Sequence, residues 1–279
     1  MAEHRYDASP GTALITGGDR GIGYALSRRL AADGWQLLWV GRTPAHLEDG
    51  NRRLMTEAGC EARVLACDLS EADAAVRVHD WACGLGAELD LLVNNAGFGA
   101  FGLLTELPLE RDLAMLRLNN ATVHRLTRLF LDGMQRRGRG TIVNIASVAG
   151  LIPMPGFAAY SGTKAFVHHY TRCLDLELRA TGSPVRAISV CPAAVRETGF
   201  QHEAGMQDTS IFRDSLATTP DVVARDIHRA LRSGRRIVVS GRAMRWVLPL
   251  AELLPRWLQD RYLLARYRRE LSAATGNRD

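Results

Sequence analysis

The chain has 279 residues, of which 47% are hydrophobic and 23% charged, with a net charge of +5 and five cysteines. This length and composition suit one α/β domain with a large core, and we expect a single domain over residues 1–279. The arginines are spread along the chain, which argues against a nucleic-acid partner. The cysteines are odd in number and lack CxxC spacing, which argues against a disulfide framework or a zinc site.

The N-terminal residues are polar and contain no apolar run of the kind that signal peptides have. No segment reaches the ~20 apolar residues that a spanning helix needs. We therefore expect a cytoplasmic protein.

The first predicted strand, residues 12–16, runs into a glycine-rich turn, GGDRGIG, over residues 17–23. A helical pattern follows from Tyr24 to Ala32. A strand, a glycine turn and a helix N-terminus form a cradle for a pyrophosphate, because backbone N–H groups and the helix dipole face the ligand. The placement of the turn after the first strand favours dinucleotide binding over an ordinary turn.

The second predicted strand, residues 36–40, ends in Gly41 and Arg42. A carboxylate at this place would bind the ribose 2′-hydroxyl, whereas an arginine accommodates a 2′-phosphate. Arg42 and Arg20, which lies in the glycine turn, together predict NADP(H) as the cofactor. The alternative is that both are ordinary members of an arginine-rich chain.

Strands and helices then alternate, which predicts a parallel, doubly wound sheet. The further strands are expected at 62–67, 89–93, 141–145, 185–190 and 237–239, and helices at 44–58, 108–137, through Tyr160 to about 179, and 221–232. Asp68 follows the third strand and is either a ligand-binding residue or a turn residue ahead of Ser70, the expected N-cap of the next helix. Residues 94–97, NNAG, follow the fourth strand and predict a floor for the cofactor.

Tyr160 and Lys164 lie four residues apart in a predicted helix and so share one face. Lys164 is the only lysine among 34 arginines, which indicates a need for an ammonium group there. A cation beside a phenol lowers its pKa, which would make Tyr160 a proton donor and acceptor near neutral pH. Ser147 follows the preceding strand and could hold a carbonyl oxygen. The alternative is an ordinary surface lysine.

Three further segments carry expectations. Asn119 and Asn120 lie within a long helical stretch, where a buried asparagine needs a role such as bending the helix or holding a water, and we expect one of the two to face solvent. Residues 196–218 predict an irregular lid or binding loop. Residues 244–269 are apolar, basic and amphipathic, and could lie on an anionic membrane surface, cover the substrate cleft or form a subunit contact; we favour packing on the chain's own domain or on a partner subunit.

Together these motifs resemble the classical short-chain dehydrogenase/reductase family over residues 11–240, with 241–279 as a helical C-terminal extension. The resemblance is carried by TGxxxGIG at 16–23, Asp68, NNAG at 94–97, Asn119, Ser147, Tyr160-x3-Lys164 and the loop at Pro192. It implies a Rossmann-type, doubly wound parallel sheet of seven strands. It also implies a catalytic tetrad in which Tyr160 is the acid/base and Ser147 holds the substrate oxygen. Lys164 would lower the Tyr160 pKa and bind the nicotinamide ribose, and Asn119 would position a water.

The resemblance further implies where NADP(H) would bind. The expected contacts are Gly17, Asp19, Arg20, Gly21, Ile22, Gly23, Arg42, Thr43, Asp68, Leu69, Asn95, Ala96, Gly97, Tyr160, Lys164, Pro192, Val195 and Thr198. Two positions depart from the family pattern: Ala193 stands where a glycine is usual, and Glu197 where a threonine is frequent, with Thr198 next to it.

We therefore expect a ketoreductase or alcohol dehydrogenase acting on a small carbonyl or alcohol substrate. Phe98, Phe101, Met154 and Phe157 suggest an apolar cleft and hence an apolar ketone. The alternatives are a non-catalytic NADP(H)-binding protein of the same fold and an epimerase or dehydratase. Family members form homodimers or homotetramers through the helices after Asn119 and Tyr160, so a homo-oligomer is expected.

Overall fold

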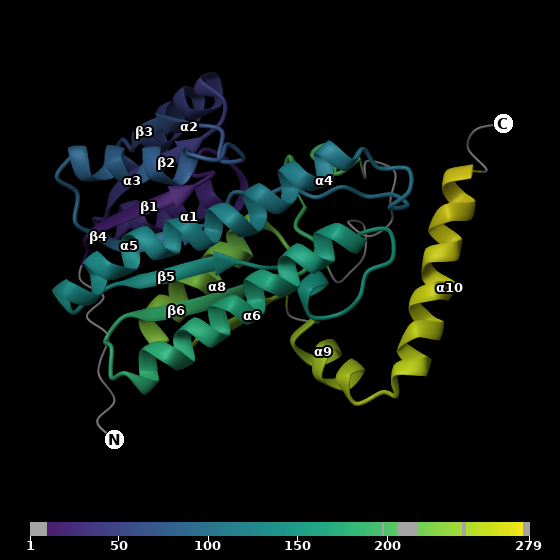
Figure 1. The fold of residues 1–279 in the computed structure, drawn as a ribbon. Helices are drawn as coiled ribbons and strands as arrows, with labels where there is room; N and C mark the ends of the chain where they lie inside the picture. The colour runs from purple at the N-terminus through teal and green to yellow at the C-terminus, as the bar shows by residue number, and fades with distance from the viewer. Residues whose placement is uncertain (1–9, 197, 206–216, 242–243, 276–279) are drawn as a thin grey trace.

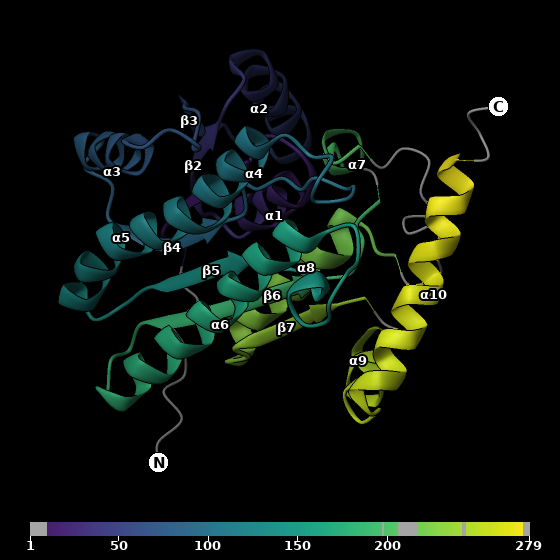
Figure 2. The same ribbon diagram turned by 45° about the vertical axis from the view of Figure 1, so that its right-hand side comes forward.

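The computed structural model describes residues 10–196, 198–205, 217–241 and 244–275. Seven parallel strands form one sheet, as predicted, and their order in it is β3-β2-β1-β4-β5-β6-β7 (Figures 1 and 2). Their bounds are β1 Thr12–Thr16, β2 Gln36–Gly41, β3 Arg63–Ala66, β4 Leu89–Asn94, β5 Thr141–Ile145, β6 Arg186–Pro192 and β7 Ile237–Ser240. The order reverses between β1 and β4, and ligands bind at such a switch point in open α/β sheets.

Helices cover both faces of the sheet (Figure 2). One face carries α1 Gly21–Ala32, α2 Pro44–Ala58 and α8 Pro220–Ser233, and the other carries α3 Ala74–Gly84, α5 Val123–Arg137 and α6 Ala158–Ala180. Within β1, Ala13 and Ile15 belong to the core on the first face and Leu14 to the core on the second. Strand residues point alternately to the two faces, so an apolar strand serves both cores.

The start of α3 differs from the prediction that Ser70 caps it. The helix begins at Ala74, with Asp73 as N-cap. The backbone N and the Oγ of Ser70 both donate to Oδ1 of Asp68, at 2.9 and 2.7 Å. Ser70 therefore closes a local Asx turn, which competes with helix capping for the same groups.

The long helical stretch contains a π-helical turn at its two asparagines. After α4 Leu109–Leu116, the π turn η1 spans Arg117–Thr122 and leads into α5. Asn119 is buried, and Asn120 is half-buried and donates from Nδ2 to the carbonyl of Thr163 at 2.9 Å. The expected irregularity of the helix is confirmed, but the expectation that one asparagine simply faces solvent is wrong.

The C-terminal extension consists of α9 Met244–Glu252 and α10 Arg256–Thr275. Met244 and Leu248 of α9 pack against Val148 and Ala193, so this part of the extension does pack on its own domain. In both ribbon views α10 stands beside the sheet and its covering helices (Figures 1 and 2). Among the described residues, none of the helices is both long and apolar enough to cross a membrane.

Candidate active site

A cleft of about 580 Å³ opens at the carboxyl ends of the strands, next to the switch point between β1 and β4. The predicted cofactor contacts come together here: all of them line the cleft except Gly23. Of the predicted tetrad, Ser147, Tyr160 and Lys164 also line it, and Asn119 does not.

The glycine turn leaves no room for side chains. Gly17 and Gly21 have φ values of 65° and 55°, which favour glycine. A Cβ on Gly23 would lie 2.0 Å from the carbonyl oxygen of Gly17, and one on Gly18 would lie 2.3 Å from the buried ring of Trp39. Gly23 therefore lets α1 close on the turn from behind the cleft, and the turn fits a dinucleotide pyrophosphate at a helix N-terminus.

The loop after β4 is tied to the same turn. Nδ2 of Asn95 donates to the carbonyls of Thr16 and Gly17 at 2.8 and 3.1 Å, and the Thr16 hydroxyl accepts from the backbone N of Asn95 and of Ala96, both at 2.9 Å. These bonds fix the predicted floor of the cleft against its cradle. The NNAG motif is thus a structural tie as well as part of the lining.

Charged groups surround the place predicted for the 2′-phosphate. Arg42 is exposed at the end of β2, and Arg20 pairs through Nη2 with Oε1 of Glu203 at 2.7 Å. Burial opposes the ionisation of Asp68, but the hydrogen bonds from Ser70 and the charge of Arg42 outweigh it and lower the Asp68 pKa. Asp68 is therefore both the turn residue and the cleft residue that the sequence left as alternatives.

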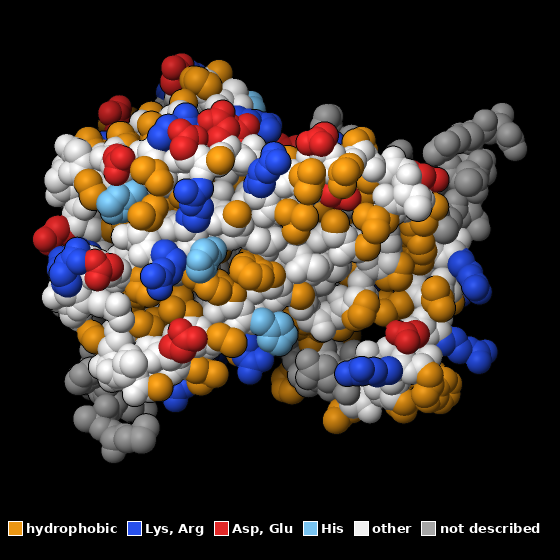
Figure 3. All heavy atoms as spheres, viewed as in Figure 1, with side chains coloured by type: hydrophobic (Ala, Val, Ile, Leu, Met, Phe, Trp, Pro, Cys, Tyr) orange, Lys and Arg blue, Asp and Glu red, His pale blue; other side chains and the backbone are white. Residues whose placement is uncertain are grey.

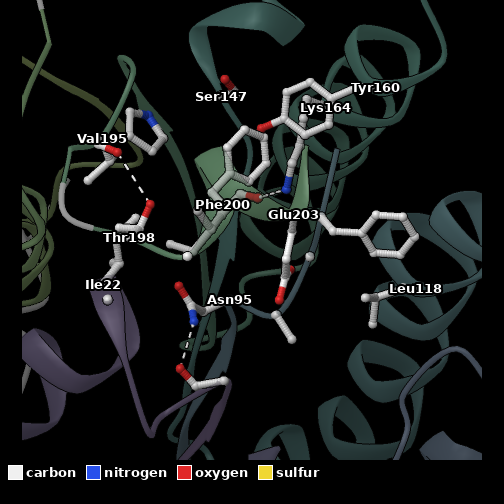
Figure 4. Close-up of a pocket in the computed structure, with 18 of the residues that line it drawn as sticks. Ile22, Asn95, Leu118, Ser147, Tyr160, Lys164, Val195, Thr198, Phe200 and Glu203 are labelled. Carbon is white, nitrogen blue, oxygen red and sulfur yellow. Dashed lines mark hydrogen bonds between the residues drawn. The ribbon is translucent and has the colours of Figure 1, made fainter. Parts of the chain in front are cut away.

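Tyr160 and Lys164 project from the first turns of α6 into the cleft, beside Ser147 (Figure 4). Both side chains are buried. Nζ of Lys164 donates to the carbonyl of Ile145 at 2.8 Å and lies 5.8 Å from the centre of the Tyr160 ring. Ser147 Oγ accepts from the backbone N of Ala149 at 3.1 Å and thereby caps a short 3₁₀ turn, Val148–Gly150.

The expected lowering of the Tyr160 pKa is contradicted. Burial raises the pKa of Tyr160 to about 12, and the hydrogen bond with Ser147 offsets only part of this effect. Burial also lowers the pKa of Lys164 to about 8. The ammonium is directed to Ile145 rather than to the phenol oxygen, so desolvation is the larger effect on both groups.

Asn119 lies behind the cleft wall rather than in it. Its Nδ2 donates to the carbonyl of Phe98 and to the Thr163 hydroxyl, both at 3.0 Å, and its Oδ1 accepts from the backbone N of Phe98 at 3.3 Å. A Cβ on Gly97 would lie 2.9 Å from that oxygen. Asn119 thus joins the loop after β4 to α6, next to Tyr160 and Lys164.

One half of the cleft is apolar. Phe98, Met154, Phe157 and Phe200 line it, and the rings of Phe157 and Phe200 each lie 5.3 Å from that of Tyr160. Phe101 does not line it but packs behind Phe157 at 5.1 Å.

The sequence also missed several lining residues. Glu203 belongs to the short helix α7, Phe200–Glu203, and Arg266 to α10; both line the cleft. Glu203 lies in the segment predicted to be a lid or binding loop, and Arg266 in the segment for which covering the cleft was one of the alternatives, but neither segment has a motif that marks the individual residue.

The two departures from the family pattern have different outcomes. Ala193 is buried among Val148, Met244 and Leu248, so its methyl group fills a small core cluster under α9. Glu197 lies outside the described residues, as do residues 206–216 of the expected lid. The described part of that loop is less irregular than predicted, since it contains α7 and a parallel bridge between Val195 and Thr218.

Comparison with known proteins agrees with this site. A family model described as short chain dehydrogenase matches residues 11–209. A very-long-chain 3-oxoacyl-CoA reductase of Mus musculus is 33% identical over 180 residues, which cover 63% of this chain and 57% of the relative. The chain therefore matches little more than half the length of this curated relative.

Two solved structures are similar over most of the chain. A short-chain dehydrogenase from Sphingobium yanoikuyae in complex with NADPH has 30% identity and a TM-score of 0.73, covering 85% of this chain and 91% of its own. A bulky-bulky ketone specific alcohol dehydrogenase from Comamonas testosteroni has 25% identity and a TM-score of 0.72, covering 95% of both chains.

Proposed function

Because the chain belongs to the short-chain dehydrogenase/reductase family, we propose that it is an NADP(H)-dependent oxidoreductase that interconverts a ketone or aldehyde and an alcohol. The observation that carries this proposal is the placement of Tyr160, Lys164 and Ser147 in one cleft beside a glycine cradle. The NADPH bound to the Sphingobium yanoikuyae structure and the reductase named among the relatives support it.

The residues of the cleft fit a dinucleotide. The glycine turn and the N-terminus of α1 would hold the pyrophosphate, Asp68 would contact the adenine, and Arg20 and Arg42 would hold the 2′-phosphate. Arg42 is exposed at the cleft edge, and no acidic residue follows β2 there. The bound cofactor would supply a hydride to the substrate carbon or accept one from it.

Tyr160 would handle the proton. With its pKa raised to about 12, the phenol is protonated at neutral pH and can donate to a carbonyl oxygen as that oxygen gains negative charge. The Ser147 hydroxyl would hold the same oxygen, and Lys164 would supply positive charge beside the phenol. In the direction of alcohol oxidation the phenol must first lose its proton, which burial disfavours. At neutral pH burial therefore keeps Tyr160 in the protonated form that carbonyl reduction requires.

The substrate is proposed to be apolar. The wall of Phe98, Phe157 and Phe200 next to Tyr160 would bury hydrocarbon on either side of a carbonyl group. The Comamonas testosteroni structure, whose title names bulky-bulky ketones, supports the same substrate class.

A homodimer is part of the proposal. Leu113, Leu116 and Phe166 line a shallow groove between α4, η1 and α6, and Leu116 and Phe166 are each 44% exposed. The groove adjoins the helices through which family members are expected to associate, because η1 contains Asn119 and leads into α5, and α6 contains Tyr160. Sedimentation velocity of wild type and of a Leu116→Arg variant tests this assembly, with a monomeric wild type as the outcome that refutes it.

The direct test of the function is reduction of a panel of bulky apolar ketones, followed as NADPH consumption, by wild type and Tyr160→Phe. The variant is expected to lose activity by about 10²- to 10⁴-fold, the usual contribution of a general acid, while still binding NADPH. Tyr170→Phe is the matched control, because Tyr170 lies on the same helix and is half-buried but does not line the cleft.

Full turnover by Tyr160→Phe would contradict the proposed mechanism. If wild type binds NADPH but oxidises it with none of the ketones, the non-catalytic alternative is favoured. Product analysis separates ketone reduction from epimerisation or dehydration, since only reduction consumes one NADPH for each alcohol formed.

A further inference from the structure

A group of large apolar side chains is exposed on α9, on the start of α10 and on the turn between them. We call it the apolar tip, and it consists of Trp246, Val247, Leu250, Leu253, Leu254, Trp257 and Leu258. Leu253 is 80% exposed, Trp246 77% and Trp257 66%. The opposite side of α9 is already buried through Met244 and Leu248, so α9 presents apolar side chains both to the core and to the outside.

Single exposed apolar residues are common on soluble proteins, but seven in a stretch of thirteen residues mark an interaction site. The space-filling view shows hydrophobic side chains gathered at the lower right, where α9 meets α10, with basic side chains along the same edge (Figure 3). Within the described part of the chain, no other element covers this corner in either ribbon view (Figures 1 and 2).

The charges beside the tip are mainly positive. Residues 244–275 contain six arginines and three carboxylate residues, so this segment carries a net charge of +3 out of the chain's +5. Trp257, Arg261 and Leu264 are exposed and follow one another at helical spacing on α10, so aromatic, cationic and apolar groups share one outward stripe. Arg256 and Arg269 are exposed on the same helix.

We propose that the apolar tip and the exposed arginines Arg256, Arg261 and Arg269 of α10 bind the surface of an anionic lipid bilayer. Tryptophan favours the boundary between headgroups and acyl chains, leucines beside it would enter the acyl region, and arginines would contact lipid phosphates. The segment would lie on the membrane and not span it, in keeping with the interrupted pattern of α9 and α10. Apolar surface and positive charge on one edge match a bilayer better than they match a second copy of this basic chain.

The same helix borders the cleft. Arg266 lines it, and the ring of Tyr267 lies 6.4 Å from that of Phe101, behind the apolar wall. A bilayer bound at the tip would therefore lie near the first residues of α10, while later residues of the same helix border the apolar half of the cleft. As a consequence that rests on the proposed function, an apolar ketone dissolved in the membrane would reach the cleft directly.

The test is flotation of the full chain with vesicles of phosphatidylcholine alone and of phosphatidylcholine mixed with phosphatidylglycerol. Wild type is expected to float with the anionic vesicles, and less so as salt is raised. Leu250→Ser/Leu253→Ser is expected to lower the partition coefficient by about tenfold or more, since two leucines leave the acyl boundary. Leu109→Ser/Leu176→Ser is the matched control, because both leucines are exposed but lie on α4 and α6.

Quenching of tryptophan emission by brominated acyl chains gives a second readout. Trp246 and Trp257 belong to the tip, whereas Trp35 and Trp39 are buried and Trp81 is half-buried on α3. Quenching in the wild type that is lost in Trp246→Phe/Trp257→Phe supports insertion of the tip. No quenching in the wild type contradicts it.

The proposal is overturned if wild type does not float with anionic vesicles, or if the control variant loses binding as much as the tip variant. If wild type does not float, a lower oligomeric state of Leu250→Ser/Leu253→Ser would identify the tip as an interface between copies instead. Activity separates the two proposals: if wild type reduces no ketone in solution, the proposed enzyme function is refuted but the proposed membrane-binding surface is not. If the tip variant and the control variant reduce a ketone dissolved in vesicles equally fast, delivery of the substrate through the tip is refuted.

Discussion

Arg20 is expected to hold a 2′-phosphate, yet in the structure it holds the carboxylate of Glu203. A carboxylate and a phosphate dianion compete for the same guanidinium, so Glu203 should weaken NADPH binding without affecting NADH. Three single substitutions test this: Glu203→Gln, Arg20→Gln and Arg42→Gln. Glu203→Gln keeps the size and shape of the side chain, whereas the two arginine variants shorten it; each substitution removes one charge.

The magnitude follows from the exposure of the pair. Arg20 and Glu203 are 47% and 34% exposed at 2.7 Å, and ion pairs of this kind contribute about 0.2–1 kcal/mol. Removing the competing charge should therefore tighten NADPH binding by about 1.4- to 5-fold. Arg20→Gln or Arg42→Gln removes a charge-assisted hydrogen bond of about 1.5–3 kcal/mol, which weakens NADPH binding by about 10- to 150-fold.

The assay is a calorimetric titration of each variant with NADPH and with NADH. Glu57→Gln is the matched control, because Glu57 pairs with Arg28 at 2.8 Å with similar exposure, but neither residue lines the cleft. Weaker NADPH binding by Glu203→Gln, or an equal effect of Glu57→Gln, would refute the competition. Equal losses for NADPH and NADH in the two arginine variants would refute the assignment of the 2′-phosphate.

Two further outcomes are expected. Lys164→Met should abolish activity and raise the free energy of unfolding near neutral pH, because burial lowers the Lys164 pKa from 10.5 to about 8. Between these two pH values the unfolded wild type binds a proton that the folded protein does not. Burying the charged Lys164 therefore lowers the free energy of unfolding of the wild type by at most roughly 3 kcal/mol below pH 8, and this cost vanishes toward pH 10.5. Urea melts of wild type and variant at both ends of this range check it, and a stability difference that stays constant with pH contradicts it. Gly23→Ala should abolish NADPH binding, because its Cβ would lie 2.0 Å from the carbonyl oxygen of Gly17. Gly162→Ala in α6 is the control: open space surrounds it, so in the same melts it should raise the free energy of unfolding by about 0.5–1 kcal/mol. Unimpaired binding by Gly23→Ala would contradict this account of the cradle.

The sheet could be predicted from the sequence because its strands are short apolar runs between turn residues. β1 Thr12–Thr16 and β5 Thr141–Ile145 begin and end as predicted, and α2 Pro44–Ala58 matches at both ends. The start of α3 could not be predicted in the same way. Ser70 serves as well in an Asx turn as at an N-cap, and only the fold decides which of the two forms.

The lining of the cleft was predictable for a related reason. The carboxyl ends of parallel strands lie at one edge of the sheet, so the residues that directly follow each strand come together at that edge. Arg20 and Glu203 are 183 positions apart, and Glu203 lies in a segment without periodicity, so no local sequence pattern could predict that they pair. The Tyr160 pKa was mispredicted because spacing gives the distance to a charge but not the degree of burial, which has the larger effect here.

The burial of Lys164 also explains why this position holds a lysine in a chain otherwise rich in arginine. Nζ donates to the Ile145 carbonyl at 2.8 Å, and a Cβ at Gly97 would lie only 3.4 Å from it. A guanidinium has five N–H donors in a planar fork and remains charged when buried. The space at Gly97 would not take that fork, and several of its donors would be left without acceptors. A single ammonium can satisfy Ile145, face the cleft, and have its pKa lowered to about 8 by the same burial that keeps Tyr160 protonated.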